Sequence, residues 1–550
     1  MGTAKGNSRS SLFLTFADRA LLFLITVLIL VFILLPVLAV MVQSLQIDGQ
    51  WDLTYYRTLF TDHADLLTNS LRVSVSVTLL SALFSVMVAI TGAFASRRIG
   101  RILQLILLFT MISPPFVTSI AYISLFGRRG WITHGLLGMT LNPYGFTGIV
   151  AMQTLGFISL NALMLIGVIR GMDRTVLLSA QDVGASTNAI LKDMVVPLMM
   201  PGIAVVLMLT FVRSLADFST PAIIGGAYGV LATEAYLNVV AYGNITRAAA
   251  MNVLLFLPSI IAFLFYRRYL KQADLTGTRA LTEGELRISR TGFLYRLCGV
   301  VTALFVGALV LQYGSIFVTA FTKMRFGEMY WTLDNLADTM PYITGTFVRS
   351  IVYSLICGIF GSLLGFLLSY YLVIRKKNWL GAVDFIGTLP YIIPGTFFGL
   401  GYIFAFRSPP LQLVGTAAIV ILNVVFRQLP FSTKVAQSAM VAIGPEIVQA
   451  GSDVGAHPLQ VLKDVVLPLS KQGFLVSFFN NFSQTMTTVG SIIFLVYPSQ
   501  KLATLVMFDV LRSGKNRVGA MIAVLLMLIV VGVNLLFVFL TREKKHVSEH

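Results

Sequence analysis

Few residues in this sequence have the type and spacing that chemistry requires, and the clearest are two charges inside an apolar segment. Arg213 and Asp217 lie four residues apart between Gly202 and Gly225. On a helix, that spacing places both side chains on one face. A charge inside a membrane span is costly, so it is usually paired or lines a water-filled cavity. The two residues therefore form either a structural ion pair or part of the wall of a translocation path.

Other kinds of chemistry have little support in the sequence. The five histidines are scattered, without the spacing of metal ligands. Cys298 and Cys357 both lie in apolar runs, where a free thiol serves as a small packing group. Gly514 and Lys515 are followed by Asn516, and the upstream glycine of a phosphate-binding loop is missing. We therefore expect no enzymatic activity, no metal site and no cofactor bound by this chain itself.

The elements that position these residues are expected to be membrane helices. Of the 550 residues, 57% are hydrophobic and 11% are charged, whereas soluble domains carry about 25% charged residues. The net charge is +17, but the basic residues gather at the ends of apolar runs, as in the cytoplasmic flanks of membrane proteins. Binding of nucleic acid is therefore not expected. The run from Leu21 has the length of a span and no cleavage site follows it, which predicts a retained first span.

Twelve segments are apolar enough and long enough to be read as spans of the bilayer. They are Leu21–Val42, Leu71–Ala95, Ile102–Phe126, Tyr144–Ile169, Gly202–Gly225, Ala248–Tyr266, Leu297–Phe321, Phe347–Ile374, Leu380–Phe406, Leu413–Phe426, Gly473–Val496 and Val518–Leu540, the tenth with a possible extension through Pro430 towards Thr433. Basic clusters occur at Arg97, Arg98 and Arg101, at Arg267, Arg268 and Lys271, at Arg375, Lys376 and Lys377, and at Arg542, Lys544 and Lys545. If both termini are cytoplasmic, all four clusters lie inside, and Arg128 with Arg129 is the main exception.

One polar stretch occurs twice, each time between apolar segments. The copies cover residues 179–198 and 450–469. Aligning Gly184 with Gly455 gives an offset of 271, the difference between 455 and 184. The same offset pairs Asp182 with Asp453, Pro197 with Pro468, and the Leu-Lys-Asp that starts at Leu191 with the one that starts at Leu462. Two matched copies indicate two equivalent docking points for a partner outside the membrane.

Each copy predicts two short helices joined at a glycine. Gly184 suits the left-handed turn that ends the first helix, and Ser186 suits the N-cap of the second. In the second copy, Pro458 stands at the first helical position. We expect the second helix to stop before Pro197 or Pro468, with Ile190, Leu191, Met194, Val195 and Leu198 on its apolar face and Lys192 and Asp193 off that face. An interfacial helix without a partner would explain one such loop, but not two at matched positions.

The two loops resemble the cytoplasmic signature of type I ABC-importer permeases: Glu-Ala-Ala, three residues, Gly, nine residues, a short apolar stretch and Pro. Leu178-Ser179-Ala180 and Gln449-Ala450-Gly451 stand where Glu-Ala-Ala is usual. In that family, the short helix after the glycine couples to a groove in an ATPase subunit. The resemblance implies ATPase contacts from Asp182, Gly184, Ala185, Ser186, Leu191, Lys192 and Pro197, and from Asp453, Gly455, Ala456, Leu462, Lys463 and Pro468.

The span count extends this resemblance over the whole chain. Six spans in each half make two parallel repeats. The first half covers residues 1–270 with its coupling loop at 178–198, and the second covers 297–550 with its coupling loop at 449–469, separated by a polar cytoplasmic linker at 271–296. The expected fold is an all-α polytopic membrane protein with about twelve transmembrane helices, built as two parallel six-helix repeats of the MetI-like permease type.

A path through the membrane would differ between the two halves. The offset of 271 places Gln484 and Thr488 where the first half has Arg213 and Asp217. Asp384 in the ninth span is a further candidate for the path, because it is another charge inside an apolar run.

Arg427 and several prolines add to this set of candidates. Arg427 lies at the end of the expected tenth span. Pro114-Pro115 and Pro390 with Pro394 interrupt the third and ninth spans at similar places. Broken helices line substrate routes in many transporters, but simple kinks have the same cause.

Two loops on the opposite side carry aromatic residues. They run over residues 43–70, with Trp51, and over 323–341, with Trp331, at equivalent places in the halves. They serve either as interfacial anchors or as a docking surface for an external partner.

The resemblance implies a permease subunit of an ATP-driven importer in the bacterial inner membrane. An external solute-binding protein would deliver cargo, and a separate ATPase homodimer would hold ATP and Mg. Residues 213–222 and 486–495 look most like the ferric-iron branch, so ferric iron is the expected cargo, with a phosphonate, a sugar phosphate, thiamine or a polyamine as alternatives. A secondary transporter of the major facilitator type is the alternative from another class. Residues 92–101 resemble its signature loop but lack the aspartate.

Overall fold

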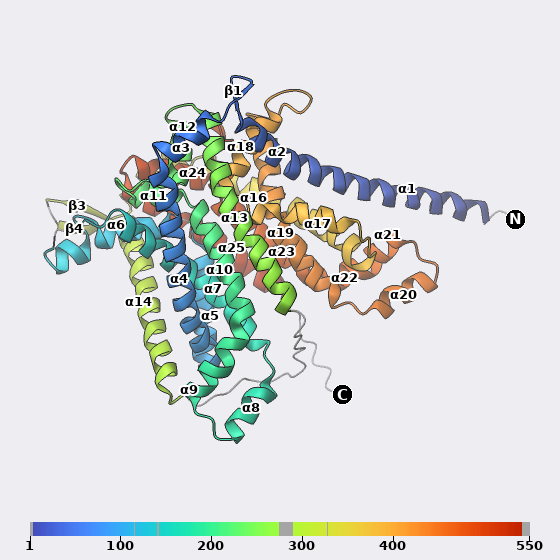
Figure 1. The fold of residues 1–550 in the computed structure, drawn as a ribbon, viewed down its shortest axis with the longest axis horizontal. Helices are drawn as coiled ribbons and strands as arrows, with labels where there is room; N and C mark the ends of the chain where they lie inside the picture. The colour runs from blue at the N-terminus through green and yellow to red at the C-terminus, as the bar shows by residue number, and fades with distance from the viewer. Residues whose placement is uncertain (1–3, 115, 140–141, 274–289, 327, 542–550) are drawn as a thin grey trace. The chain divides into compact units, whose positions relative to one another are not determined.

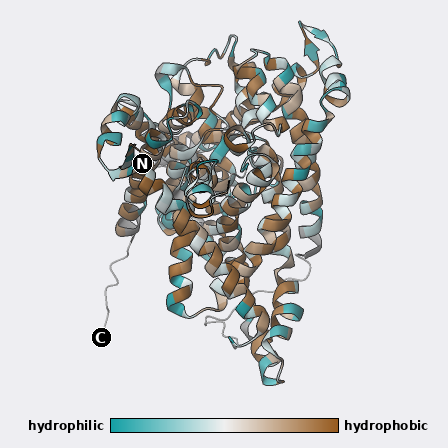
Figure 2. Cartoon of the chain, turned by 90° about the vertical axis from the view of Figure 1, so that its left-hand side faces the viewer, coloured by the Kyte–Doolittle hydropathy of each residue, from teal (hydrophilic) through white to brown (hydrophobic). Residues whose placement is uncertain are grey.

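A computed structural model describes residues 4–114, 116–139, 142–273, 290–326 and 328–541. The described chain is almost entirely helical, with two short antiparallel hairpins (Figure 1). Figure 2 shows hydrophobic residues along the long helices and hydrophilic residues in the hairpins, loops and helix ends. This arrangement is what a bilayer requires, because a helix satisfies its own backbone hydrogen bonds in hydrocarbon. The expected all-α polytopic membrane fold is confirmed.

The elements before the linker follow one another in a fixed order. They are α1 (Ala4–Ile29), η1 (Leu30–Leu34), α2 (Leu35–Gln43), β1 (Gln46–Ile47), β2 (Gln50–Trp51), α3 (Thr54–Thr61), α4 (Ala64–Phe94), α5 (Arg97–Ile112), α6 (Val117–Phe126), η2 (Trp131–Leu136), α7 (Phe146–Arg170), α8 (Arg174–Asp182), α9 (Thr187–Ala189), η3 (Ile190–Val195), α10 (Val196–Ala216), α11 (Ser219–Ile224), α12 (Leu231–Val240) and α13 (Ile245–Ala273).

The elements after the linker repeat this order with small differences. They are α14 (Phe293–Phe321), β3 (Thr322–Arg325), β4 (Glu328–Trp331), α15 (Asp334–Ile343), α16 (Thr346–Ser369), η5 (Tyr370–Ile374), α17 (Leu380–Thr388), η6 (Leu389–Tyr391), α18 (Gly395–Phe406), α19 (Ala417–Val441), α20 (Pro445–Asp453), α21 (Pro458–Val461), η7 (Leu462–Val466), α22 (Leu467–Leu469), α23 (Lys471–Thr487), η8 (Pro498–Gln500), α24 (Ala503–Arg512) and α25 (Asn516–Thr541).

The offset found in the sequence recurs at the helix ends. The starts and ends of α7 and α19 differ by 271 in residue number, as do those of α8 and α20. The end of α10 and the end of α23 also differ by 271. Helices α6 and α18 both end at a phenylalanine, at an offset of 280, because the loop before α7 is longer than the loop before α19. The internal repeat is therefore a repeat of structure as well as of sequence.

The number of spans is lower than the twelve expected. In the described part of the chain, nine helices are long and apolar enough to cross a membrane, and a tenth is added if α17, η6 and α18 form one span bent by 115°. The third expected span is divided into α5 and α6, with Pro114 between them, because proline cannot continue the backbone ladder. The eleventh, α23, has only 17 residues.

Three expected span boundaries were wrong. Helix α10 ends at Ala216 rather than Gly225, because Asp217 adopts an extended conformation with φ −79° and ψ 106°. Helix α23 ends at Thr487 rather than Val496. Helix α19 begins at Ala417 and continues through Pro430, as the expected extension had it, but it ends at Val441, beyond both Phe426 and Thr433.

The chain divides into two compact units that differ from the two halves of the sequence. Unit 1 contains residues 1–52, 343–505 and 528–550, and unit 2 contains 53–342 and 506–527. The first span of each half therefore belongs to the unit built mainly from the other half. Most of the expected linker and the cluster of Arg542, Lys544 and Lys545 lie outside the described residues.

Each unit has its own buried interior. In unit 2, helices α4, α7, α10 and α14 surround a core that includes Val88, Leu165 and Phe305. In unit 1, α16 packs against α19 and α23, and α2 packs against α18. Cys298 in unit 2 and Cys357 in unit 1 are both free and buried, which confirms their role in packing.

Candidate functional site

The first coupling loop begins with a capped helix. Asp173 accepts hydrogen bonds from the hydroxyl of Thr175 at 2.7 Å and from its backbone N–H at 2.8 Å. These bonds from Thr175 lower the pKa of the Asp173 carboxyl, since they stabilise its charged form. A negative charge at this position also suits the positive end of the dipole of α8. Figure 1 shows α8 and α9 at the end of α7 and α10 that is far from α12.

Both loops turn at a glycine in the left-handed region, as expected. Gly184 has φ +83° and Gly455 has φ +78°. The N–H of Ala185 bonds to the carbonyl of Ala180 at 2.9 Å, and the N–H of Ala456 bonds to that of Gly451 at 3.1 Å, which closes the same turn in both copies. A Cβ at either glycine would have no neighbour within 4 Å. Glycine is needed here for its backbone conformation and not for space.

The caps of the second helices also agree with the sequence. The Ser186 hydroxyl accepts from the N–H of Ala189 at 3.3 Å. In the second copy, the ring of His457 accepts from the N–H of Leu459 at 3.3 Å, and Gln460 accepts from the N–H of His457 at 2.7 Å. Pro458 occupies the first helical turn, as expected. His457 was not singled out in the sequence, because histidine is an uncommon capping residue.

The expected stop before Pro197 and Pro468 was wrong. The helix passes through the π-helical turn η3 and continues as α10, which contains Pro197 in its first turn. The N–H of Val196 bonds to the carbonyl of Leu191, five residues back, and the N–H of Leu467 bonds to that of Leu462 in the same way. The wider π turn accommodates the proline that follows. In the second copy, the helical run is interrupted only at Ser470.

One face of the first coupling helix is buried in the core of unit 2. Ile190, Leu191 and Val195 are at most 2% exposed and belong to the same cluster as Phe94 of α4 and residues of α7 and α14. Leu198 was assigned to this face incorrectly, since it is 43% exposed. A displacement of the loop must therefore move, or be resisted by, the packed ends of three spans.

The outer side of each loop is accessible. Of the residues expected to contact an ATPase, those with exposed side chains or backbone are Asp182, Gly184, Ala185, Ser186, Lys192 and Pro197 in the first copy and Asp453, Gly455, Lys463 and Pro468 in the second. Ala456 and Leu462 are half-buried, and Leu191 is buried.

Two exposed valines were missed. Val183 is 90% exposed and Val454 is 84% exposed, each directly before the turn glycine and related by the offset of the repeat. A single exposed apolar side chain is common, so the matched position in both copies, and not the exposure alone, marks these valines as candidate contacts for a partner. The shared Asp-Val-Gly-Ala sequence was the available signal.

Each coupling helix is hydrogen-bonded to a span of its own unit. In unit 2, Asn188 accepts from the N–H of Leu294 at 3.0 Å, so the coupling helix caps the first turn of α14. In unit 1, the Tyr370 hydroxyl donates to the carbonyl of Pro458 at 2.7 Å. These bonds tie the loops to α14 and to η5 respectively.

Asp217 does not share a helix face with Arg213. One Asp217 carboxylate oxygen accepts from the N–H groups of Ser219 and Thr220 at 2.9 and 3.2 Å and from the Ser219 hydroxyl at 2.5 Å, which starts α11. The other accepts from the Gln153 amide at 2.9 Å. Arg213 lies on an exposed part of α10. The carboxylate thus serves as a local cap that is also held by α7.

The second half has the same backbone at the corresponding place without the charges. Thr488 follows the end of α23 in an extended conformation, with φ −71° and ψ 143°. Gln484 is half-buried in the last turn of α23. The two halves therefore end this span in the same way with different side chains.

The remaining candidates have partners. Asp384 forms an ion pair with Lys434 at 3.0 Å and accepts from Gln437 at 3.2 Å. Arg427 lies within α19 rather than at its end, and it donates to the carbonyls of Pro390 and Ile393 at 3.3 and 3.1 Å. It satisfies carbonyl groups freed by the break between α17 and α18. Within the described residues, no cluster of three His, Cys, Asp or Glu side chains could hold a metal ion.

The sequence is similar to one protein family and to several named transport proteins. Residues 81–273 match the family of binding-protein-dependent transport system inner membrane components. The chain is 28% identical over 494 residues to a protein of Haemophilus influenzae named as a ferric transport system permease, FbpB 1, covering 87% of this chain and 78% of that protein. It is 25% identical over 486 residues to the ferric transport system permease protein FbpB of Actinobacillus pleuropneumoniae, covering 86% of this chain and 70% of that protein.

A relative that matches a shorter part of the chain is named for a different cargo. Over 178 residues the chain is 27% identical to a protein of Salmonella typhimurium named as a 2-aminoethylphosphonate transport system permease, PhnV, covering 32% of this chain and 64% of that protein. The matched domain, the duplicated coupling loops and the membrane helices agree with one another. Residues 81–273 thus match the binding-protein-dependent inner-membrane transport family and, over most of its length, the chain is similar to proteins named as ferric transport permeases.

Proposed function

We propose that this chain is the membrane subunit of an ATP-driven importer that takes ferric iron from an external binding protein and releases it into the cytoplasm. The observation that carries the proposal is the pair of coupling loops, which share the positive-φ glycine, the exposed valine before it and the π turn after it. Two equivalent loops on one chain suit a symmetric partner, such as a homodimer of ATPase subunits.

ATP and Mg belong to that partner in this proposal. The two loops transmit its closure to the spans, because each is fixed to its unit by a buried face or a hydrogen bond. The spans then alternate between an outward-open and an inward-open state. With the loops in the cytoplasm, the N- and C-termini are cytoplasmic too.

Ferric iron is supported by the names of the two relatives that match most of the chain. The permease needs no resident metal site, since the external binding protein selects the cargo. A 2-aminoethylphosphonate is the second candidate, because the PhnV relative carries that name and Arg213 could attract an anion. The residues proposed to line the path are Arg213, Asp217, Gln484, Thr488 and Asp384.

The first experiment tests the coupling loops. In Val183→Asp and Val454→Asp variants, a charge replaces the exposed apolar side chain at the turn, and we expect the ATPase to dissociate during purification while the permease remains in the membrane. Val240→Asp is the matched control, since Val240 is 53% exposed at the end of α12. Retention of the ATPase by the double loop variant would contradict the proposed docking.

The second experiment tests the cargo. The complex is reconstituted in liposomes with its binding protein, and ATP hydrolysis is measured with ferric iron, 2-aminoethylphosphonate, a sugar phosphate, thiamine or a polyamine. Stimulation by ferric iron alone is the expected result. Stimulation by another cargo, with none by iron, would reject the iron assignment and leave the importer proposal intact.

A further inference from the structure

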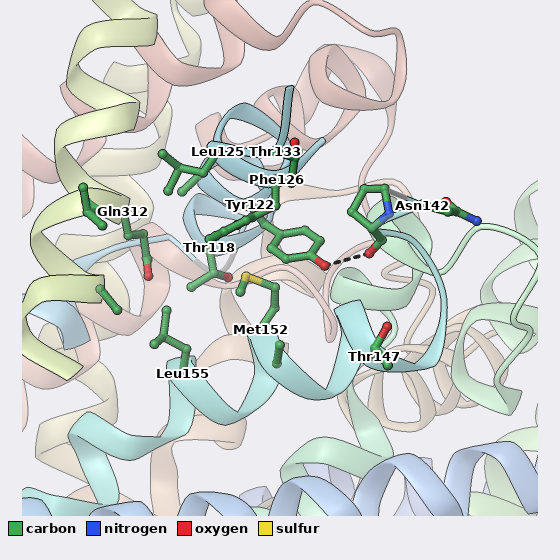
Figure 3. A pocket seen from close by; sticks show the side chains of 15 residues that line it. Thr118, Tyr122, Leu125, Phe126, Thr133, Asn142, Thr147, Met152, Leu155 and Gln312 are labelled. Atoms are coloured by element: carbon green, nitrogen blue, oxygen red, sulfur yellow. Dashed lines mark hydrogen bonds between the residues drawn. The ribbon is translucent and has the colours of Figure 1, made fainter. Parts of the chain in front are cut away.

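A cavity of about 550 Å³ lies inside unit 2, between α6, α7 and α14 (Figure 3). Its size falls within the range of small-molecule sites, about 300–1,000 Å³. The lining residues are Thr118, Ala121, Tyr122, Leu125, Phe126, Thr133, Asn142, Pro143, Thr147, Ala151, Met152, Leu155, Ala308, Leu311 and Gln312. The coupling loops and the candidate path residues do not contribute to it.

The cavity lies against α7 and α14, two of the helices that are long and apolar enough to cross a membrane. On α7, its lining extends from Thr147 to Leu155, near the end of that helix remote from α8. Eight residues of helix correspond to about 12 Å. Leu311 lines the cavity and is 53% exposed, so the space reaches the outer surface of α14. Hydrocarbon chains of the bilayer therefore have access to it.

The second half of the chain provides an internal comparison. Helices α18 and α6 correspond at an offset of 280, and α19 and α7 at 271. The first spans correspond at 276, since Gln46 pairs with Trp51 as Thr322 pairs with Trp331. The N–H of Asp52 also bonds to the carbonyl of Leu45 as that of Thr332 bonds to that of Phe321. With these offsets, the cavity residues Ala308, Thr118, Tyr122, Phe126 and Leu155 correspond to Phe32, Phe398, Tyr402, Phe406 and Phe426.

In unit 1 these five positions form a packed aromatic cluster. The ring of Phe32 lies 5.0 Å from that of Phe426 and 5.3 Å from that of Phe406. Tyr402 lies 5.1 Å from Phe398, and its hydroxyl donates to the carbonyl of Phe32 at 2.8 Å. All five side chains are at most 8% exposed. The same place in the fold is therefore filled in one unit and hollow in the other.

The two units also differ in how closely the first span approaches its neighbour, which is α18 in unit 1 and α6 in unit 2. A Cβ on Gly401 would lie 2.6 Å from the carbonyl oxygen of Pro36, so glycine allows close contact between α18 and α2. The corresponding residue in α6 is Ala121, whose methyl group lines the cavity. The same close contact is not available to α14. At three of the five positions, unit 2 also has a smaller side chain than unit 1. Ala308, Thr118 and Leu155 stand where unit 1 has phenylalanine, and the difference in volume leaves the space open.

Because the space opens on the outer surface of α14, its apolar walls gain dispersion contacts when hydrocarbon fills it. The part of the wall nearest Leu155 includes the apolar side chains of Ala151, Met152 and Ala308. The polar side chains of the lining are Thr118, Tyr122, Thr133, Asn142, Thr147 and Gln312. Among them, Gln312 is 3% exposed and its Oε1 has no hydrogen-bond partner among the described residues. A ligand with a long apolar part and a polar end fits this lining.

We propose that the cavity binds one acyl chain of a bilayer phospholipid, which enters beside Leu311. Figure 3 shows Asn142 and Leu155 at opposite ends of the lining residues. The polar end of the lipid lies towards Asn142, and the chain lies along Met152 and Leu155, with Gln312 on the α14 side of the lining (Figure 3). This site belongs to unit 2 only, because aromatic side chains occupy its counterpart in unit 1.

The test uses the full chain in phosphatidylethanolamine and phosphatidylglycerol vesicles that contain a phospholipid with a diazirine in its acyl chain. After illumination, mass spectrometry locates the adducts. We expect labelling on the lining residues of α6, α7 and α14, and its loss in the filled variant, in which Ala308→Phe and Thr118→Phe copy unit 1. Leu304→Phe is the matched control, since Leu304 also lies on α14, is 69% exposed and does not line the cavity.

A reciprocal variant tests the same site without depending on the folding of the variant that carries Ala308→Phe and Thr118→Phe. Phe32→Ala with Phe398→Thr should open the counterpart in unit 1 and produce new labelling on α2 and α18. Added phospholipid should also raise the Tm of the wild-type protein in detergent more than that of the filled variant. Wild-type labelling of the cavity no stronger than that of the exposed face of α14, or labelling unchanged in the filled variant, would overturn the assignment.

Discussion

The Asn161 amide of α7 donates to the Thr210 hydroxyl of α10 at 2.9 Å, and the same contact recurs at the equivalent place in the second half with the residue types exchanged. There, the Asn481 amide of α23 donates to the Ser432 hydroxyl of α19 at 2.9 Å. All four side chains are buried. The two spans that flank each coupling loop thus share an amide–hydroxyl contact at the same place, and either helix can supply the amide.

We expect Thr210→Val to destabilise the protein by about 1 kcal/mol, because it leaves the Asn161 amide without its partner inside the membrane. The exchange Asn161→Ser with Thr210→Asn copies the second half and should recover most of that loss. Thermal unfolding in detergent measures both. An exchanged variant as unstable as Thr210→Val would show that the pair depends on its surroundings and not on the bond.

The offset of 271 was visible in the sequence because the coupling loops are polar and stand out between apolar segments. It predicted the positive-φ glycines, the Ser186 cap and the two equivalent loops correctly. The Asn161–Thr210 pair was not visible, because its residue types are exchanged between the halves and no single residue repeats.

Other features depend on contacts between distant segments. The ends of α10 and α23 lie nine residues before the end of the apolar run, because Asp217 and Thr488 turn the backbone where hydropathy gives no signal. The exchange of first spans between the units also leaves no mark in composition. Leu198 was misplaced because the π turn of η3 rotates the residues after it relative to a regular helix.

The second prediction concerns the turn glycines. At Gly184 and Gly455 nothing would touch a Cβ, so any loss comes from the left-handed backbone, about 1–2 kcal/mol for most residues. Asparagine tolerates this conformation better than valine does. We therefore expect Gly184→Asn with Gly455→Asn to retain the ATPase and uptake, and Gly184→Val with Gly455→Val to lose both. Equal losses in the two variants would point to a need for the bare backbone at the interface instead.

The third prediction concerns Asp217, whose carboxylate caps α11 and binds Gln153. Asp217→Leu removes the acceptor of two backbone N–H groups, and we expect a loss of about 1–3 kcal/mol in unfolding free energy. Asp217→Asn keeps one acceptor oxygen and should lose less. If the charges only neutralised each other, Arg213→Leu combined with Asp217→Leu would restore stability. We expect this double variant to remain as unstable as Asp217→Leu. Full transport by it would also exclude both residues from the path.

The last prediction is the orientation of unit 2 in the membrane. Helix α14 has 29 residues, a length of about 44 Å, which exceeds the hydrocarbon core of about 30 Å. Its first turn is bonded to Asn188 in the coupling helix, and its last residue leads into the hairpin of β3 and β4. A cysteine at Ser186 and one at Asp334 should therefore react with an impermeant maleimide from opposite sides.

Asp334 is suitable for this labelling because its replacement leaves the closer ion pair of Lys323 with Asp338, at 2.8 Å, in place. The hydrogen bond with Asp338 raises the pKa of Lys323, which favours the charged form of this pair. The native Cys298 and Cys357 are 5% and 1% exposed and should contribute little background. We expect the Asp334→Cys variant to be labelled in intact cells and the Ser186→Cys variant only in inverted vesicles. Labelling of both in intact cells would contradict the cytoplasmic placement of the coupling loops, and with it the proposed site of the ATPase.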